Sequence, residues 1–288
     1  MEAKVHYTNE NHSTCIREKN GVTYLTFPLL EKNGLIHGFT TRLGGVSQGD
    51  CSSMNLSFTR GDREEDVREN YRLIGEALGI NMEKACLSHQ VHKTNLYCVT
   101  KEDIGRGIDS NKDKLFEMDG LMTKEKGIPL VTFFADCVPL LFYDPKAGVI
   151  ASSHSGWRGT VEKIGAKTVE LMVEKMGCCK EDILAVIGPS ICQSCYEVSE
   201  DVAREFGRVF SGEDYEEMIL DKKNGKYQLD LWKTNEVILL QSEIRKENLA
   251  VTDLCTCCNP EFLFSHRASH GKRGNLSAIM CLTDSIRR

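Results

Sequence analysis

Residues 135–160 read ADCVPLLFYDPKAGVIASSHSGWRGT, and this stretch forms the centre of the predicted fold. Two short apolar runs, at residues 138–143 and 149–153, flank a segment that begins with Asp144 and contains Pro145 and Gly148. Apolar runs separated by such turn residues predict a β-hairpin. We therefore expect two antiparallel strands here.

Cys137 and His154 lie on the two arms of this predicted hairpin. The midpoint between them falls between Pro145 and Lys146, inside the turn. The two residues should therefore face each other or nearly so, with their Cβ atoms about 5 Å apart. A thiolate and an imidazole this close make either half of a metal site or a nucleophile beside its base.

The composition is that of an ordinary globular chain. Its 288 residues are 41% hydrophobic and 27% charged, which is enough for a sizeable core. A net charge of -6 without a basic block argues against a nucleic-acid partner. The first residues show no apolar signal segment and no long apolar run follows, so we expect no membrane partner and a cytoplasmic location.

The chain contains 13 cysteines. Their odd number and the expected reducing compartment favour free, mostly buried thiols. Cys192-x2-Cys195 together with a second group can be interpreted as a thiolate metal site. This second group reads Cys255-x-Cys257-Cys258, and in that reading its spacing differs from that of the usual zinc knuckle. We therefore expect these cysteines to be buried structural residues rather than ligands of a second metal.

Periodic apolar residues predict the remaining elements. We expect a polar N-terminal arm over residues 1–20 and one catalytic domain over residues 21–288. Strands are predicted at residues 22–27, 35–40, 85–99, 119–122, 129–136, 183–187, 262–264 and 278–282. Helices are predicted at residues 62–79, 160–176, 198–210 and 231–246, with Asp62 and Asp230 as N-caps.

Strands and helices are interspersed in this pattern, and the strands are often paired as hairpins. This arrangement predicts an α/β (α+β) fold, with mixed β-sheets covered by helices in a single domain.

Two further histidines, His89 and His92, lie near another predicted strand end, in polar sequence where a core histidine is less natural. Because they are three residues apart on an extended strand, they should point to opposite faces, and only one can act as a ligand. Two histidines and a cysteine at strand ends supply three ligands and leave a fourth tetrahedral position open. That arrangement is typical of a catalytic zinc.

Two arginines are candidates for binding an anion. Arg42 lies in a Gly-containing loop, where a plain turn with a solvated arginine is the favoured interpretation from that stretch alone. Arg158 lies at the predicted start of a helix, whose amides can hold an anion. Packing of Arg158 on Trp157 is an equally good interpretation.

Several motifs occur in an order that resembles the YfiH family, over about residues 22–282. The resemblance implies a mixed α/β fold and a zinc ion bound by the histidine of QVH, the cysteine of ADC and the histidine of HSGWRG, here His92, Cys137 and His154. At residues 265–270, His and Ser replace a second Arg and an Asp that are common in the family, which leaves the role of this segment open. The motifs are HGFTTRLGGVS at 37–47, QVH at 90–92, DG at 119–120, ADCVPL at 135–140, HSGWRG at 154–159, GP at 188–189, YEV at 196–198 and FSHR at 264–267.

Members of this family are labelled polyphenol oxidases or laccase-domain proteins and, more recently, purine nucleoside phosphorylases. The resemblance therefore implies phosphorolysis of adenosine, inosine and methylthioadenosine, together with deamination of adenosine. The expected small-molecule partners are purine nucleosides and phosphate, with Arg42 and Arg158 as phosphate ligands. We expect His92, Cys137, His154 and Arg158 to form the catalytic set.

Other functions remain open at this point. Zinc has no redox chemistry, whereas two histidines and a cysteine can also hold copper, as the oxidase label of the family implies. A multicopper oxidase also needs several His-x-His pairs, which this sequence lacks. A metal-independent cysteine hydrolase or deamidase could use Cys137 and His154, and a zinc-stabilised interaction domain is a third, weaker alternative. The sequence does not predict the oligomeric state.

Overall fold

The computed structural model describes residues 4–108 and 117–284. Its helices are α1 (Glu64–Leu78), α2 (Trp157–Val161), α3 (Ile164–Met176), α4 (Glu200–Val209), α5 (Gly212–Met218) and α6 (Leu231–Gln241). Its strands are β1 (Cys15–Lys19), β2 (Val22–Thr26), β3 (Leu35–Thr40), β4 (Cys86–Leu87), β5 (Leu96–Cys98), β6 (Gly120–Thr123), β7 (Leu130–Phe134), β8 (Val138–Asp144), β9 (Val149–Ser155), β10 (Leu184–Ile187), β11 (Glu197–Ser199), β12 (Ile219–Asp221), β13 (Lys226–Leu229), β14 (Leu249–Val251) and β15 (Leu276–Leu282).

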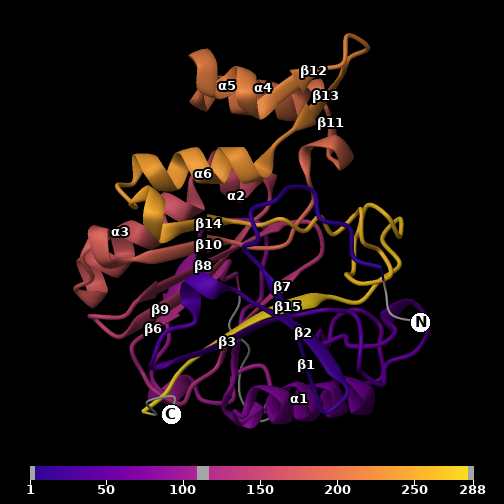
Figure 1. Cartoon of the computed structure of the whole chain (residues 1–288), viewed down its shortest axis with the longest axis vertical. Helices are drawn as coiled ribbons and strands as arrows, with labels where there is room; N and C mark the ends of the chain where they lie inside the picture. Colours follow the sequence, from indigo (N-terminus) through magenta and orange to yellow (C-terminus); the bar gives the residue numbers. More distant parts are fainter. Residues whose placement is uncertain (1–3, 109–116, 285–288) are drawn as a thin grey trace.

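Two six-stranded mixed sheets pack against each other in the middle of the molecule (Figure 1). The first has the strand order β1-β2-β3-β15-β7-β4, and the second has the order β14-β10-β8-β9-β6-β5. Helix α1 covers the outer face of the first sheet, and α3 and α6 cover the outer face of the second. The result is a four-layer α/β/β/α arrangement.

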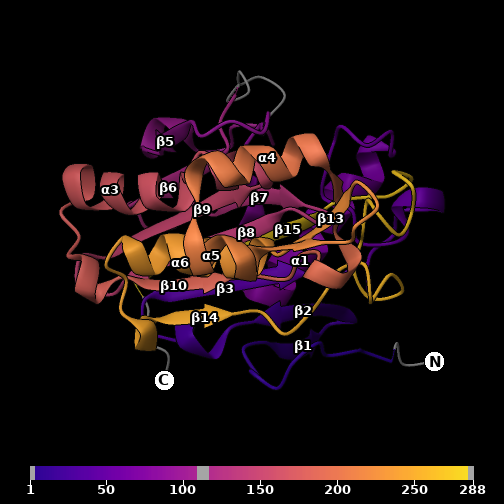
Figure 2. The same cartoon turned by 90° about the horizontal axis from the view of Figure 1, so that it is seen from above.

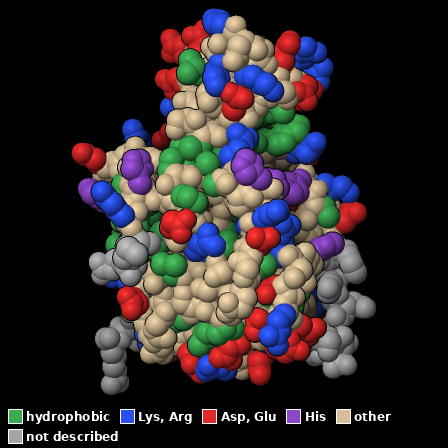
Figure 3. All heavy atoms as spheres, turned by 90° about the vertical axis from the view of Figure 1, so that its right-hand side faces the viewer, with side chains coloured by type: hydrophobic (Ala, Val, Ile, Leu, Met, Phe, Trp, Pro, Cys, Tyr) green, Lys and Arg blue, Asp and Glu red, His purple; other side chains and the backbone are tan. Residues whose placement is uncertain are grey.

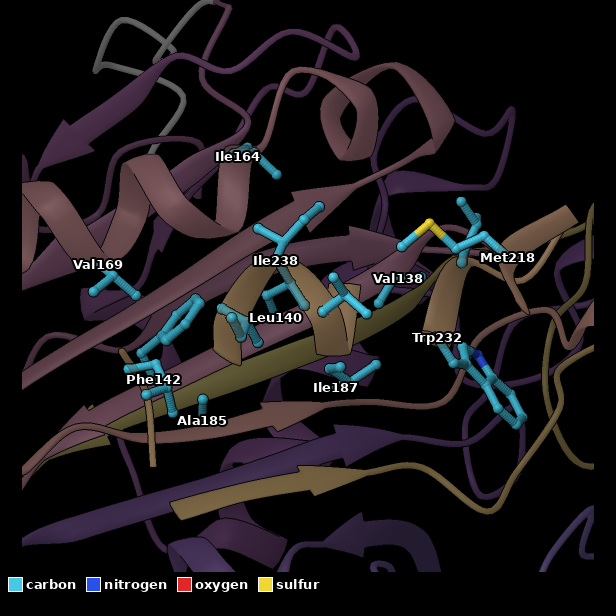
Figure 4. Close-up of a cluster of buried hydrophobic side chains, with 14 of the residues drawn as sticks. Val138, Leu140, Phe142, Ile164, Val169, Ala185, Ile187, Met218, Trp232 and Ile238 are labelled. Atoms are coloured by element: carbon cyan, nitrogen blue, oxygen red, sulfur yellow. The ribbon is translucent and has the colours of Figure 1, made fainter. Parts of the chain in front are cut away.

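Strand β8 shows how the sequence produces these layers. Its residues alternate between the two faces of the sheet, as a period of two requires. Val138, Leu140 and Phe142 point towards the helices, where they pack with side chains of α3 and α6 (Figure 4). Leu141 and Tyr143 point the other way, into the core between the two sheets. Both faces of β8 are therefore buried, which explains its continuous apolar run.

A third, smaller sheet projects from this body. Its order is β11-β13-β12, and it carries α4 and α5 at the top of Figure 1. Seen from above in Figure 2, α4, α5 and α6 lie over the strands of the second sheet. Within the described residues, no helix is long and apolar enough to cross a bilayer.

The structure confirms the predicted α/β class and the central hairpin. β8 and β9 pair antiparallel around a four-residue turn. Helix α6 begins after Asp230 as predicted, and the Asp230 side chain accepts a hydrogen bond from the Lys233 N–H at 2.9 Å. Helix α1 ends at Gly79, which adopts a φ of 75°.

Several predicted boundaries are wrong. Asp62 does not cap α1, because its carboxylate accepts hydrogen bonds from Ser47 and Asn55 instead. The helix predicted at 160–176 is divided into α2 and α3 by Lys163, which has a φ of 57°. Residues 262–264 form a turn rather than a strand, and the helix predicted at 198–210 begins only after strand β11.

Part of the stretch predicted to be a polar arm is in fact ordered against the body. Cys15–Lys19 forms β1, which pairs with β2 in the first sheet. The backbone N–H of Thr8 donates to the carbonyl of Asp253 at 2.9 Å. Residues 1–3 of the predicted arm lie outside the described residues.

Candidate metal centre

Three side chains from distant parts of the chain converge at one end of the sheets. His92 lies in the loop between β4 and β5, Cys137 directly precedes β8, and His154 lies near the end of β9. One potential ligand atom from each lies within 4.8 Å of the other two. The two imidazole rings meet edge to face, with centroids 4.8 Å apart. The structure therefore brings together the three residues that the sequence predicts as metal ligands.

The hairpin register differs by two residues from the one expected. Pro139, not Cys137, is the direct partner of His154. Since residues 137 and 139 share a face of a strand, Cys137 still lies diagonally next to His154. The turn at residues 145–148 is therefore placed slightly further along than the sequence midpoint predicts.

The loop that carries His92 is not an extended strand, contrary to expectation. β4 ends at Leu87 and β5 begins at Leu96, and His92 itself has a φ of 62°. Gln90 fixes this loop to the edge of β7, because its side-chain amide exchanges two 2.7 Å hydrogen bonds with the backbone of Phe133. His89 lines the same cavity as His92, so the argument that the two point to opposite faces does not apply.

Asp119 is the residue that organises this centre, and sequence reasoning missed its role. Its carboxylate accepts hydrogen bonds from the backbone N–H groups of Val91, His92 and Lys93, at 3.1, 2.9 and 2.9 Å. It also lies 2.9 Å from Nδ1 of His154. A carboxylate behind a histidine fixes the ring so that the other nitrogen can bind a metal. The motif DG at 119–120 was the only sequence signal.

The charges of this centre favour a deprotonated thiol. Burial disfavours ionisation, but the charge and hydrogen bonds of His154 and His92 lower the pKa of Cys137 to about 6. Burial also disfavours an imidazolium, yet Cys137 and Asp119 raise the pKa of His154 to about 9. A thiolate is the form that binds a metal and also the form that acts as a nucleophile, so both interpretations persist.

A cavity of about 260 Å³ adjoins the three residues. Its walls combine aromatic rings, hydroxyl and amide groups, and two arginines. A cavity of this kind accommodates part of a small ligand that has both an apolar ring and polar groups. The lining residues include Ser57, Phe58, Arg60, Ser88, His89, Gln90, His92, Phe133, Phe134, Cys137, His154, Arg273 and Asn275.

The two arginines of the cavity, Arg60 and Arg273, are neighbours that repel each other. Arg60 donates to the backbone carbonyls of Arg273 and Gly271, at 3.3 and 3.1 Å. Burial, followed by the charge of Arg60, lowers the pKa of Arg273 to about 10. Among the described residues, the buried Nε of Arg273 has no hydrogen-bond partner. An anion between these guanidinium groups would relieve the repulsion.

Sequence reasoning also missed these two arginines. The available signal was the basic, Gly-containing segment GKRGN at 271–275, just before the last predicted strand. The loops after β3 and before β15 lie on the right of Figure 1. Figure 3 shows that side of the molecule, where lysine, arginine and histidine side chains gather below the projecting small sheet.

The structure places the two predicted phosphate ligands outside this cavity. Arg42 donates to the carbonyls of Ser52 and Pro260, at distances from 2.7 to 3.0 Å, and its guanidinium lies over the ring of Phe264. Arg158 is exposed, and its guanidinium lies 4.3 Å from the ring centroid of Trp157. Neither lines the cavity beside the three converging residues.

Comparison with known proteins gives matches over most of the chain. A family model described as "Multi-copper polyphenol oxidoreductase laccase" matches residues 36–283. The purine nucleoside phosphorylase YlmD of Bacillus subtilis is 36% identical over 251 residues, which are 87% of this chain and 90% of that protein. A purine nucleoside phosphorylase of Bacteroides thetaiotaomicron is 35% identical over 86% of this chain and 92% of its own length.

Solved structures show the same fold. The YfiH protein of Bacillus licheniformis superposes with a TM-score of 0.87 at 31% identity, covering 93% of this chain and 99% of that one. YlmD from Geobacillus stearothermophilus gives a TM-score of 0.86 with the same identity and coverage.

Proposed function

The chain belongs to the YfiH family, whose model is described as multi-copper polyphenol oxidoreductase laccase, and from this membership we propose that it is a purine nucleoside phosphorylase acting on inosine, adenosine and methylthioadenosine. Similar proteins that carry the name purine nucleoside phosphorylase support the proposal. One observation carries it furthest: a single cavity joins a paired-arginine site to aromatic walls and a metal-ligand set.

The three converging residues fit a zinc ion. Their donor atoms lie within 4.8 Å of one another, and Asp119 orients His154 from behind. Two histidines and a cysteine also occur in blue-copper sites, so the donor set by itself admits copper as well. When bound, zinc would polarise a substrate group or activate water at its open position.

The cavity also contains groups that could bind the phosphate and the purine base in phosphorolysis. Arg60 and Arg273 would hold phosphate through paired N–H groups, as guanidinium forks do. Phe58 and Phe133 line the cavity with aromatic side chains, against which a purine can pack. In the reaction, a phosphate oxygen forms a bond to C1′ of the ribose while the bond from C1′ to N9 breaks. The bonding electrons leave with the purine, which takes up a proton.

Deamination of adenosine is the second activity we propose for the same cavity. The observation that favours it is that His92, Cys137 and His154 all line the cavity, so a metal bound by them would lie beside the space proposed for the base. Replacing the amino group at C6 by oxygen requires an activated water and a proton for the leaving ammonia.

The test is an assay of inosine with and without phosphate, on protein of measured metal content. We expect hypoxanthine and ribose 1-phosphate only when phosphate is supplied. Equal hypoxanthine formation in phosphate-free buffer would identify a hydrolase and overturn the proposal. For the second activity, adenosine should yield inosine without any need for phosphate.

Two alternative functions, a cysteine hydrolase and a laccase, predict different results. A cysteine hydrolase using Cys137 and His154 would keep full activity after complete removal of metal. A laccase would oxidise phenols and need a copper cluster rich in histidine. Within the described residues, the other candidate metal group contains four cysteines and no histidine. The described residues therefore give no support to a multicopper mechanism.

A further inference from the structure

Four cysteines form a second cluster, at the base of the projecting small sheet. Cys192 and Cys195 follow β10, and Cys255 and Cys258 follow β14. All four Sγ atoms lie within 4.8 Å of one another. Those of Cys195 and Cys258 are 3.5 Å apart, and those of Cys192 and Cys258 are 4.0 Å apart. The reaction proposed above uses none of them.

The spacing of these cysteines corrects the sequence interpretation. Cys257 is adjacent to Cys258 in the sequence, but it does not belong to the cluster. Without it, Cys255-x2-Cys258 has the same C-x2-C spacing as Cys192-x2-Cys195. Two C-x2-C knuckles are the usual ligand set of a closed zinc site with four cysteine ligands.

The distances agree with such a site. Four sulfurs at about 2.3 Å from a central zinc ion lie about 3.8 Å from one another in a tetrahedron. The Sγ–Sγ distances of Cys195–Cys258 and Cys192–Cys258 lie on either side of this value. A small closing movement would therefore complete the tetrahedron.

The backbone around the cluster supplies an independent indication. The N–H groups of Cys192 and Cys258 both point at Sγ of Cys255, at 3.2 and 3.4 Å. Cys255 is fully buried, and Cys192 is 6% exposed. N–H hydrogen bonds to a buried sulfur favour its thiolate form, which is the form that binds a metal.

We propose that Cys192, Cys195, Cys255 and Cys258 bind a structural zinc ion, separate from the centre at His92, Cys137 and His154. Four protein ligands leave no open position for substrate, so this zinc would stabilise the structure rather than react. The proposal concerns metal content alone and does not depend on the phosphorylase activity.

The contacts of the cluster indicate what this zinc would hold in place. Thr256, inside the second knuckle, donates its hydroxyl to Asp136 at 2.6 Å. The N–H of Ile191, just before the first knuckle, donates to the Asp136 carbonyl at 3.0 Å. Asp136 directly precedes Cys137 and has a φ of 84°. Both knuckles therefore brace the turn that presents a ligand of the first centre.

Arg267 connects the turn at Asp136 to the segment that carries the first knuckle. Its backbone N–H donates to the Asp136 carboxylate at 2.6 Å. Its guanidinium donates to the carbonyls of Cys195 and Glu197, at 3.0 and 2.9 Å. The segment at 265–270, whose role the sequence left open, is thus part of this brace.

The experiment is elemental analysis of the full chain, purified in the presence of a phosphine reductant. We expect about two zinc ions per chain in the wild type. Cys195→Ser and Cys258→Ser should each retain about one. His92→Ala should also retain about one, held by the cysteines. Cys257→Ser is the matched control and should retain two, because Cys257 lies in the same knuckle and its thiol contacts Cys195, yet it is not one of the four proposed ligands.

A second measurement does not require any cluster variant to fold. In the native wild type, the four cluster cysteines should resist alkylation until a strong chelator is added, as shown by peptide mass spectrometry. Alkylation of these residues at the same rate with and without chelator would overturn the proposal. So would a mass deficit of two or four hydrogens that reductant reverses, because it would show disulfides in place of a metal. Stoichiometric iron would overturn the assignment to zinc.

Failure of this proposal is distinguishable from failure of the proposed function. A chain with one zinc that is lost in Cys137→Ala, and with phosphate-dependent activity, would refute the second site alone. A chain with two zinc ions but no nucleoside chemistry would refute the function alone.

Discussion

Asp119 contributes no metal ligand in the proposed centre, yet it holds two of the three ligands in place. Its two oxygens receive three backbone N–H groups from the His92 loop and the ring of His154. The hydrogen bonds from His154 and from the N–H of Lys93 outweigh the effect of burial and lower the pKa of Asp119. This single side chain therefore sets both the loop conformation and the ring orientation.

We expect Asp119→Asn to weaken zinc binding at the first centre about 10- to 100-fold, as loss of an orienting carboxylate usually does. The amide can accept fewer of the four hydrogen bonds and cannot charge-balance His154. Chelator competition on the purified protein measures the effect. Asp103→Asn is the control, because Asp103 is also buried but lies elsewhere, as part of a capping box with Thr100. Equal zinc affinity in the two variants would refute the role of Asp119.

Kinetics can distinguish the phosphate site proposed at Arg60 and Arg273 from the one that the sequence predicts at Arg158. Arg273→Lys should raise the phosphate KM roughly tenfold, because lysine keeps the charge but loses the guanidinium fork. Arg158→Lys should leave the phosphate KM unchanged if Arg158 only stacks on Trp157. A raised KM in Arg158→Lys with a normal one in Arg273→Lys would move the phosphate site to the helix α2 side.

At the scale of elements, the sharp connection between β9 and α2 decides how closely the three ligands approach. Gly156 caps α2 directly after β9 and lies against the centre. A Cβ atom at this position would meet Sγ of Cys137 at 3.1 Å and Cδ2 of His92 at 3.2 Å. The glycine of HSGWRG therefore leaves room for the ligands.

Gly156→Ala should weaken zinc binding at the first centre roughly tenfold, because displacing ligands by about 0.5 Å takes them out of tetrahedral geometry. Gly159→Ala is the matched control in the same helix. Its Cβ would meet no atom closer than 3.4 Å, so zinc content should stay normal. Isothermal titration of metal-stripped protein gives both affinities. If both variants bind zinc like the wild type, close packing at Gly156 is irrelevant to the centre.

At the scale of the whole molecule, the metal ligands lie at the ends of strands while the cores lie between layers. Phe142 on β8 is fully buried among side chains of the helices (Figure 4). Buried Thr132 and Ser152 join the two sheets by a 2.6 Å hydrogen bond between their hydroxyls. We therefore expect the packed layers to be stable without a metal ion at the first centre.

Phe142→Ala should reduce the free energy of unfolding by about 3–5 kcal/mol, the usual effect of removing a buried aromatic side chain. Phe142→Leu should cost less, because it leaves a smaller cavity. Urea denaturation of the metal-loaded protein measures both. The zinc content of the folded fraction should remain that of the wild type. Loss of zinc from folded Phe142→Ala would show that core and metal centre are coupled.

Local sequence patterns were sufficient to predict most helices and strands and to indicate candidate metal ligands at strand ends. Apolar runs around a turn predicted the hairpin at 138–153, because a strand with both faces buried needs continuous apolar residues. Histidine and cysteine at predicted strand ends pointed to Cys137, His154 and one of His89 and His92, and the family resemblance selected His92. The same patterns failed for the loop at 88–95, since Gln90 and Asp119 replace strand pairing there with side-chain hydrogen bonds.

Which distant residues meet became clear only from the folded chain. Arg60 and Arg273 are 213 positions apart, yet Arg60 donates to the backbone of Arg273. The two cysteine knuckles, 63 positions apart between Cys192 and Cys255, meet because β10 and β14 pair in parallel and the chain leaves both strands at the same edge. Local spacing predicts neighbours within a turn or a strand, whereas partners across a sheet are fixed by strand order and register, which no short segment encodes.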